Sequence, residues 1–177
     1  MRAFIAVELS EQVRKNLQPF QKALDLEGIK LVEPENLHIT LFFLGEIDDR
    51  TKGKVVEAME KVSVPKFELN CKGVGVFPNP NFIRVAWAGC ENENLTKLYE
   101  QLAPEMRKLR YKIEPFRGHV TVARVRDPST KGNVQKALEK FEGKDFGTCE
   151  IGKIVLKKSI LTPQGPVYED VFTKELG

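Results

Sequence analysis

Apolar and polar residues follow two different periods along the chain. Between Val13 and Leu24 apolar residues recur every three or four positions, which is typical of one helix face; from Leu37 to Leu41 they alternate with polar residues, as in a strand. In the first half we expect strands over 4–9, 37–44 and 67–76, and helices over 10–24 and 49–62. In the second half we expect strands over 83–88, 118–125, 150–161 and 167–173, and helices over 94–109 and 129–141. This alternation of strands and helices predicts an α/β protein.

The two halves of the chain also resemble each other. His38-Ile39-Thr40-Leu41 recurs in the second half as His119-Val120-Thr121-Val122, and Phe4-Ile5-Ala6-Val7 recurs at a similar offset as Phe82-Ile83-Arg84-Val85. The shared order of such matches indicates an internal duplication, with sequence repeats at about 1–77 and 82–161. We therefore expect a single domain over 1–177, made of two lobes related by an approximate two-fold axis.

Composition narrows the class of protein only slightly. The chain has 177 residues, of which 41% are apolar, and a formal net charge of +3. No apolar run approaches the roughly 20 residues of a membrane span, and the N-terminus does not resemble a signal peptide. We therefore expect a soluble cytoplasmic monomer without membrane association. Cys71, Cys90 and Cys149 fit no zinc or redox spacing and are expected to be small buried residues.

The two histidines of the sequence both begin a His-x-Thr-x motif, at matching places in the repeat. Because alternate strand residues share a face, His38 projects with Thr40, and His119 with Thr121. Two imidazoles near their ordinary pKa of ~6.5 can act as acid and base at neutral pH, and threonine hydroxyls can bind phosphate oxygens. No metal-ligand spacing is visible. A single His-x-Thr-x motif is usually an ordinary strand, but its duplication favours a two-histidine site for phosphoryl transfer.

Segments spread over the whole chain resemble the 2H phosphoesterase superfamily, and within it the RNA 2′,3′-cyclic phosphodiesterases that are also called 2′-5′ RNA ligases. The segments that carry the resemblance are 2–7, 36–41, 43–46, 76–80, 84–87, 118–124, 159–162 and Gly165. The resemblance implies a bilobal fold with antiparallel-rich sheets flanking a central groove. It also implies hydrolysis of 2′,3′-cyclic phosphate RNA ends to 2′-phosphomonoesters, without metal or nucleotide cofactor.

The resemblance also implies individual roles. His38 would protonate the leaving O3′, His119 would activate water, and Thr40 and Thr121 would hold the phosphate. Arg124 matches a phosphate-contacting arginine of the family. Strict alternation, however, turns Arg124 away from His119, so it can reach the groove only if the strand ends or bulges near Ala123.

Other residues are candidates for contacts with the bases or the RNA strand. Phe42 lies on the His38 face by parity and could stack on a base, although core packing is the ordinary interpretation. Phe77 could line the groove or anchor a turn, and Trp87 is expected in the core. From 107 to 131 the chain has eight basic and two acidic residues, so Arg107 and Arg110 are candidate strand contacts; a solvated surface is the alternative.

Three other functions stay open at this point. The same site, run backwards with a 5′-hydroxyl in place of water, would make 2′-5′ linkages, and joining tRNA halves could be its main activity. A phosphodiesterase for small cyclic or 2′-5′ nucleotides would use the same groups. A non-catalytic RNA-binding module would not need both histidines. RNA with a 2′,3′-cyclic phosphate end, including tRNA fragments, is therefore the expected partner.

Overall fold

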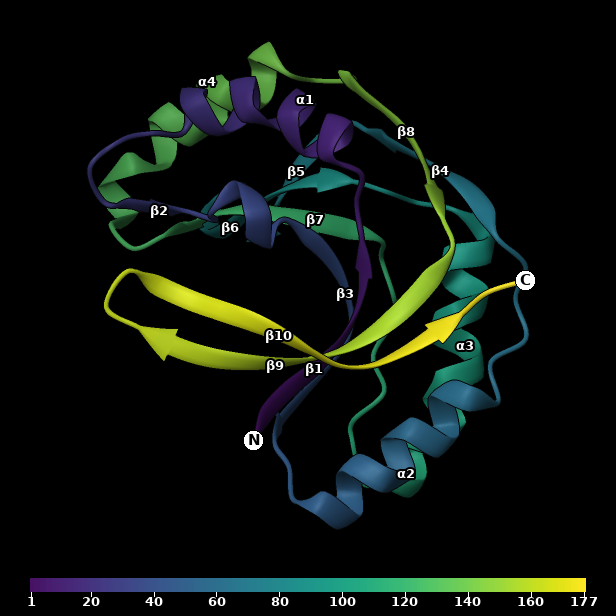
Figure 1. Cartoon of the computed structure of the whole chain (residues 1–177). Coiled ribbons are helices and arrows are strands. Elements are labelled where there is room, and N and C mark those ends of the chain that lie inside the picture. The colour runs from purple at the N-terminus through teal and green to yellow at the C-terminus, as the bar shows by residue number, and fades with distance from the viewer.

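The computed structural model describes residues 1–177 and has a mixed architecture of four helices and ten strands (Figure 1). The helices are α1 (Glu11–Ala23), α2 (Asp49–Glu60), α3 (Glu93–Lys108) and α4 (Lys131–Lys140). The strands are β1 (Arg2–Glu8), β2 (Ile29–Leu31), β3 (His38–Glu46), β4 (Phe67–Lys72), β5 (Val74–Asn79), β6 (Phe82–Gly89), β7 (His119–Val125), β8 (Asp145–Ile151), β9 (Lys153–Thr162) and β10 (Gly165–Glu175). The predicted fold class is confirmed.

Capping side chains explain where two of the helices begin. The Ser10 hydroxyl accepts a hydrogen bond from the Val13 amide at the start of α1, and the Asp48 carboxylate accepts one from Thr51 at the start of α2. Pro19 and Pro104 lie inside the continuous helices α1 and α3. None of the helices combines the length and the apolar character that crossing a membrane requires.

Two predicted strands are each divided in the structure. The segment predicted over 67–76 forms β4 and β5, which separate at Gly73, where φ is +80°. The segment predicted over 150–161 likewise becomes β8 and β9, which separate at Gly152. In both cases the first strand joins a two-stranded β4–β8 sheet, while the second joins the main sheet. Each segment was predicted as one strand because its apolar pattern continues across the glycine at which the chain passes from one sheet to the other.

The main sheet is antiparallel and has the strand order β10-β9-β1-β3-β7-β6-β5, with β2 beside β7. The last strand of each repeat pairs in the other repeat: β5 pairs with β6, and β9 pairs with β1. Helices are exchanged in the same way, since α1 contacts β7 and β8, and Figure 1 shows α1 next to α4. The structural halves are therefore interleaved, and each contains elements of both sequence repeats.

The structure also corrects how the first strands of the repeats correspond. Ala6 of β1 lies opposite Thr40, and Trp87 of β6 lies opposite Thr121. Ala6 and Trp87 are separated by the same offset as the two His-x-Thr-x motifs. Phe4 thus corresponds to Val85, and the alignment of Phe4 with Phe82 was wrong because it ignored this common offset. It rested on a shared phenylalanine that does not share a structural position.

Candidate active site on two adjacent strands

The two His-x-Thr-x motifs lie on neighbouring strands at the centre of the main sheet. β3 and β7 are joined at Ile39 and Val120, whose side chains are fully buried. Extending this antiparallel register by one residue on each side puts His38 opposite Thr121, and Thr40 opposite His119. The two imidazoles and two hydroxyls therefore project from the same face of the sheet, as strand parity predicted, and the structure brings all four together.

Each of these strands has a bulge directly after its threonine. On β3, Thr40 and Phe42 face consecutive residues of β1, so Leu41 is the extra residue; on β7, Val122 is the extra residue opposite β6. A bulge moves the following side chains to the other face. The result is that Phe43 and Arg124, which each lie three positions after the threonine of their motif, occupy equivalent positions on the histidine face.

The bulge on β3 overturns the parity argument that put Phe42 on the His38 face. The bulge on β7 is the one that Arg124 needs in order to reach that face. Phe42 is 7% exposed and stacks on Tyr99 of α3, with ring centroids 4.6 Å apart, so it belongs to the core beneath the sheet. Phe43 is instead 71% exposed, and its ring centroid lies 6.5 Å from that of Phe4, which stacks on His38. Arg124 is exposed, and its charge acts on the pKa of His38. Strict alternation failed because it assumed a regular strand.

Backbone carbonyls fix both imidazoles in the same tautomer. Nδ1 of His38 donates to the carbonyl oxygen of Asn36, and Nδ1 of His119 donates to that of Arg117, each over 2.7 Å. A carbonyl oxygen can only accept, so the proton of each neutral ring lies on Nδ1 and the lone pair on Nε2. In His38 this Nε2 accepts from the Thr40 hydroxyl at 2.7 Å. Both rings thus direct their basic nitrogen away from the backbone that holds them.

The surroundings of His38 are aromatic and cationic. Phe4 stacks on the imidazole at 4.9 Å, and Tyr168 meets it edge-on at 5.5 Å. Burial lowers the pKa of His38 to about 4, and the nearby charges of Lys157 and Arg124 contribute in the same direction. The hydrogen bond to Asn36 opposes this shift. Without a ligand, His38 is therefore neutral at pH 7.

The surroundings of His119 are more open. The ring of Phe77 meets the imidazole edge-on with centroids 5.0 Å apart, which places this predicted residue beside His119, and the Trp87 ring lies 6.1 Å away. Trp87 is 5% exposed, as expected, but it lies opposite Thr121 on the histidine face and is not part of the hydrophobic core where it was expected. The Arg117 guanidinium lies 4.6 Å above the Trp87 ring and pairs with Glu91. Burial lowers the pKa of His119 as well.

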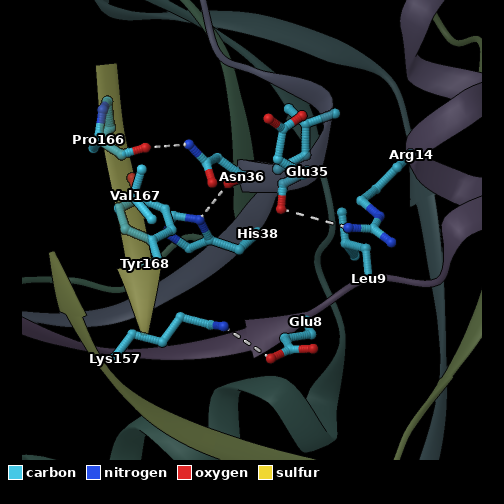
Figure 2. A pocket seen from close by; sticks show the side chains of 11 residues that line it. Glu8, Leu9, Arg14, Glu35, Asn36, His38, Lys157, Pro166, Val167 and Tyr168 are labelled. Carbon is cyan, nitrogen blue, oxygen red and sulfur yellow. Dashed lines mark hydrogen bonds and ion pairs between the residues drawn. The ribbon is translucent and has the colours of Figure 1, made fainter. Parts of the chain in front are cut away.

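A cavity of about 290 Å³ lies beside His38 (Figure 2). Lys157 lines this cavity and forms ion pairs with Glu8 at 2.9 Å and with Asp170 at 2.7 Å. Tyr168 and Asn36 stand close to His38, and the Asn36 amide donates to the carbonyl of Pro166. His119 and the two threonines do not line this cavity. No sequence motif indicated Glu8, Lys157 or Tyr168, because only the pairing of β1 with β9 and of β9 with β10 brings these residues next to His38.

The predicted strand contacts Arg107 and Arg110 lie away from the histidines. They are at the C-terminal end of α3, where the neighbouring Tyr111 hydroxyl donates to the Leu44 carbonyl at the far end of β3. Six strand residues at ~3.3 Å each separate Leu44 from His38, a span of about 20 Å. The basic segment is therefore split: only its later part, with Arg117 and Arg124, accompanies the site.

The site's own groups are suited to proton transfer and anion binding. Nowhere in the structure do three or more His, Cys, Asp or Glu side chains gather in a possible metal-binding group. What the two strands offer is two imidazoles whose Nε2 atoms are not held by the backbone, two hydroxyls and one guanidinium. This set can give and accept protons on opposite sides of a bound phosphate.

Comparisons with known proteins identify a family to which the chain is similar. A family described as LigT like Phosphoesterase matches the chain twice, over 7–87 and 89–168. Two proteins named RNA 2′,3′-cyclic phosphodiesterase, from Archaeoglobus fulgidus and Methanocaldococcus jannaschii, are each 38% identical to this chain. The alignments cover 97% and 96% of this chain, and 98% and 97% of the relatives.

Solved structures share the fold over nearly the whole chain. The Thermus thermophilus protein TT0787 superimposes with a TM-score of 0.84 at 29% identity, over 99% of this chain and 97% of its own. Escherichia coli LigT complexed with 3′-AMP gives a TM-score of 0.80 at 22% identity, over the same shares of each chain. The family match spans most of the chain in two successive copies, and the relatives align along their full length. This protein therefore belongs to the LigT-like phosphoesterase family, within the 2H phosphoesterases.

Proposed function

We propose that this protein hydrolyses 2′,3′-cyclic phosphate ends of RNA to 2′-phosphomonoesters, using His38 and His119 as acid and base. The observation that carries the proposal is the matched pair of imidazoles on adjacent strands, each with Nδ1 held by a carbonyl. The substrate class comes from the relatives named RNA 2′,3′-cyclic phosphodiesterase, which align along this whole chain.

The reaction breaks one phosphorus–oxygen bond and forms another. His119 Nε2 takes a proton from a water molecule as its oxygen bonds to phosphorus. The bond from phosphorus to O3′ breaks, and protonated His38 gives its proton to O3′. The products are a 2′-phosphate and a free 3′-hydroxyl, and the two histidines return to their starting states by exchanging protons with solvent.

The phosphate itself prepares His38 for the role of acid. In the free protein, burial is the main cause of the low pKa of His38, and the charges of Lys157 and Arg124 lower it further. A bound phosphodiester anion offsets these positive charges and favours the imidazolium, so the pKa of His38 rises as substrate binds. Thr40, Thr121 and Arg124 supply donors for the non-bridging oxygens, where negative charge increases in the transition state.

One exposed and one half-buried aromatic side chain on the histidine face support an RNA substrate. Phe43 follows Thr40 on β3, and Phe77 lies against His119. Nucleic-acid-binding proteins use such side chains to stack unpaired bases. We assign the base contact proposed from the sequence to Phe43 in place of Phe42, and we retain Phe77.

The test is to incubate the protein with an oligonucleotide that ends in a 2′,3′-cyclic phosphate and to identify the product end. We expect a 2′-phosphate, formed at the same rate in excess EDTA because the assigned groups are all side chains. A 3′-phosphate would mean that O2′, and not O3′, is the leaving group. Loss of the reaction on chelation would contradict the mechanism. Adding an RNA with a 5′-hydroxyl distinguishes hydrolysis from ligation, which would yield a longer 2′-5′-linked product.

A further inference from the structure

Two buried thiols meet directly behind the strand that carries His119. Cys71 lies in β4, and Cys90 immediately follows β6; both are fully buried, and their sulfur atoms are 2.9 Å apart. Non-bonded heavy atoms attract best at roughly 3.5–4.0 Å, so these sulfurs are inside the usual contact distance. The fold thus presses the two side chains against each other.

The remaining distance to a covalent bond is small. A disulfide joins sulfurs about 2.05 Å apart, so bonding requires the two sulfurs to approach by about 0.9 Å more. The third cysteine, Cys149 of β8, lies opposite Leu69 of β4, whereas Cys71 of β4 lies opposite Gly147 of β8. Only the Cys71–Cys90 pair has its sulfur atoms in contact. Cys149 therefore provides a matched internal control within the same buried region.

We propose that Cys71 and Cys90 form a structural disulfide that braces the His119 half of the active site. Two exchange steps with a small-molecule disulfide as oxidant would form it. One thiolate first displaces a small thiol and makes a mixed disulfide; the second thiolate then displaces the other small thiol. Two protein thiols are oxidised to one S–S bond, and the small-molecule disulfide is reduced to two thiols.

The bond would act on the backbone that carries His119. The Cys90 amide donates to the Gly118 carbonyl over 2.9 Å, and Gly89 pairs with His119 across β6 and β7. Packing here is close, since a β-carbon at Gly118 would lie only 2.6 Å from the Cys90 carbonyl oxygen. Fixing Cys90 to Cys71 would hold the start of β7, and with it the carbonyl that orients the His119 ring.

The bond must form before the core closes. Contact with Cys71 and burial both raise the pKa of the Cys90 thiol, so the reactive thiolate is scarce in the folded protein. Exchange is therefore fast while the chain folds and slow afterwards. Once formed, the buried bond is shielded from reductants, which suits a permanent brace better than a rapid switch.

The experiment uses the full chain, unfolded and refolded with oxidised glutathione, then denatured without reductant and alkylated. We expect one alkylated cysteine, Cys149, and a linked peptide containing Cys71 and Cys90. The Tm should be about 5–10 °C higher than in the reduced protein, because the bond closes a loop of 19 residues.

Single alanine variants separate the cysteines. Cys149→Ala should keep both the linkage and the Tm difference, whereas Cys71→Ala and Cys90→Ala should lose both. If a variant does not fold, the oxidised and reduced wild-type proteins still decide the matter. Three alkylated cysteines after oxidative refolding, a linkage to Cys149, or an equal Tm in both redox states would each overturn the proposal. None of these readouts depends on the enzymatic activity.

Discussion

The two strands that carry the site share their backbone but differ in their surroundings. His38 and His119 each begin a His-x-Thr-x motif, and the Nδ1–H of each donates to a carbonyl two residues earlier. Each motif is followed by a bulge at the equivalent position. Around His38, however, lie Tyr168 and an ion-paired lysine, whereas His119 is more open to solvent. The duplicated backbone fixes where the imidazoles lie, and the differing neighbours set how readily each one holds a proton.

The residues after the two bulges differ in chemistry as well. Phe43 on β3 and Arg124 on β7 are equivalent by position, yet one is an exposed aromatic ring and the other a cation. The two strands are equivalent in backbone, yet the histidine face offers an aromatic contact on β3 and a charged contact on β7. A nucleotide end matches this arrangement, because its base can contact Phe43 and its phosphate can contact Arg124.

Replacing either histidine should have the largest effect. His38→Ala and His119→Ala should each lower kcat on the order of 10²–10⁴-fold, because each removes a proton-transfer group. RNA affinity should change little, since other side chains supply the binding contacts. Single-turnover rates and equilibrium binding to a non-reactive oligonucleotide measure the two quantities separately. A leaving group that needs no proton should partly rescue His38→Ala alone; rescue of His119→Ala instead would exchange the two roles.

The threonines should come next and should differ from each other. Thr40→Val and Thr121→Val each remove one donor to the developing charge, a loss on the order of 10²-fold in kcat. Thr40 also donates to His38 Nε2, a bond that stabilises the neutral ring, and His119 has no such bond to Thr121. Only Thr40→Val should therefore raise the pKa of its histidine, as NMR titration can show. Thr→Ser variants keep the hydroxyl and serve as controls; equal titration shifts in both valine variants would contradict the difference.

The pH dependence of stability should also distinguish the halves. His38 has a folded-state pKa of about 4, against about 6.5 when unfolded. Above pH 6.5 both states are neutral at this residue; as pH falls towards 4, the unfolded chain binds a proton that the folded chain does not. His38 should then cost about 3 kcal/mol of unfolding free energy by pH 4.

Denaturant unfolding from pH 7 to 4 measures this loss against His38→Gln, which should lack it. His119→Gln should remove a smaller part of the acid sensitivity, because His119 is more exposed. Identical pH dependence in wild type and His38→Gln would show that the environment of His38 has been misjudged.

Substitutions after the bulges should have the smallest effects. Phe43→Ala should weaken binding of single-stranded RNA by about 1–3 kcal/mol through lost stacking, with little change in stability. Phe42→Ala is its control: it should destabilise the fold by about 3–5 kcal/mol and leave RNA affinity intact. Arg124→Ala should weaken binding and flatten its salt dependence more than Arg107→Ala does, because only Arg124 faces the histidines. Equal changes of the salt dependence in Arg124→Ala and Arg107→Ala would mean that the whole basic segment contacts RNA.

Strand periodicity and duplication were enough to predict the shared face of the four His and Thr side chains. They could not predict the bulges at Leu41 and Val122, since an inserted residue is set by pairing with another strand. Strict parity put Phe42 on the histidine face for that reason, whereas the structure shows the core packing that was its ordinary interpretation. The exchange of β5 and β9 between the repeats also depends on strand pairing and could not be predicted. Each of these strands was predicted as part of one longer strand, which the structure divides at Gly73 or Gly152. Glu8, Lys157 and Tyr168 join His38 only through contacts between strands distant in sequence.

The most direct test of the central claim is the single-turnover rate of the His38→Ala/His119→Ala double variant on an oligonucleotide ending in a 2′,3′-cyclic phosphate. If the two strands form one reactive unit, the double variant should be about as slow as the slower single variant. It should fall far short of the product of the two losses. Losses that multiply fully would mean that the histidines act independently, and full rate in either single variant would mean that they are not the acid and base.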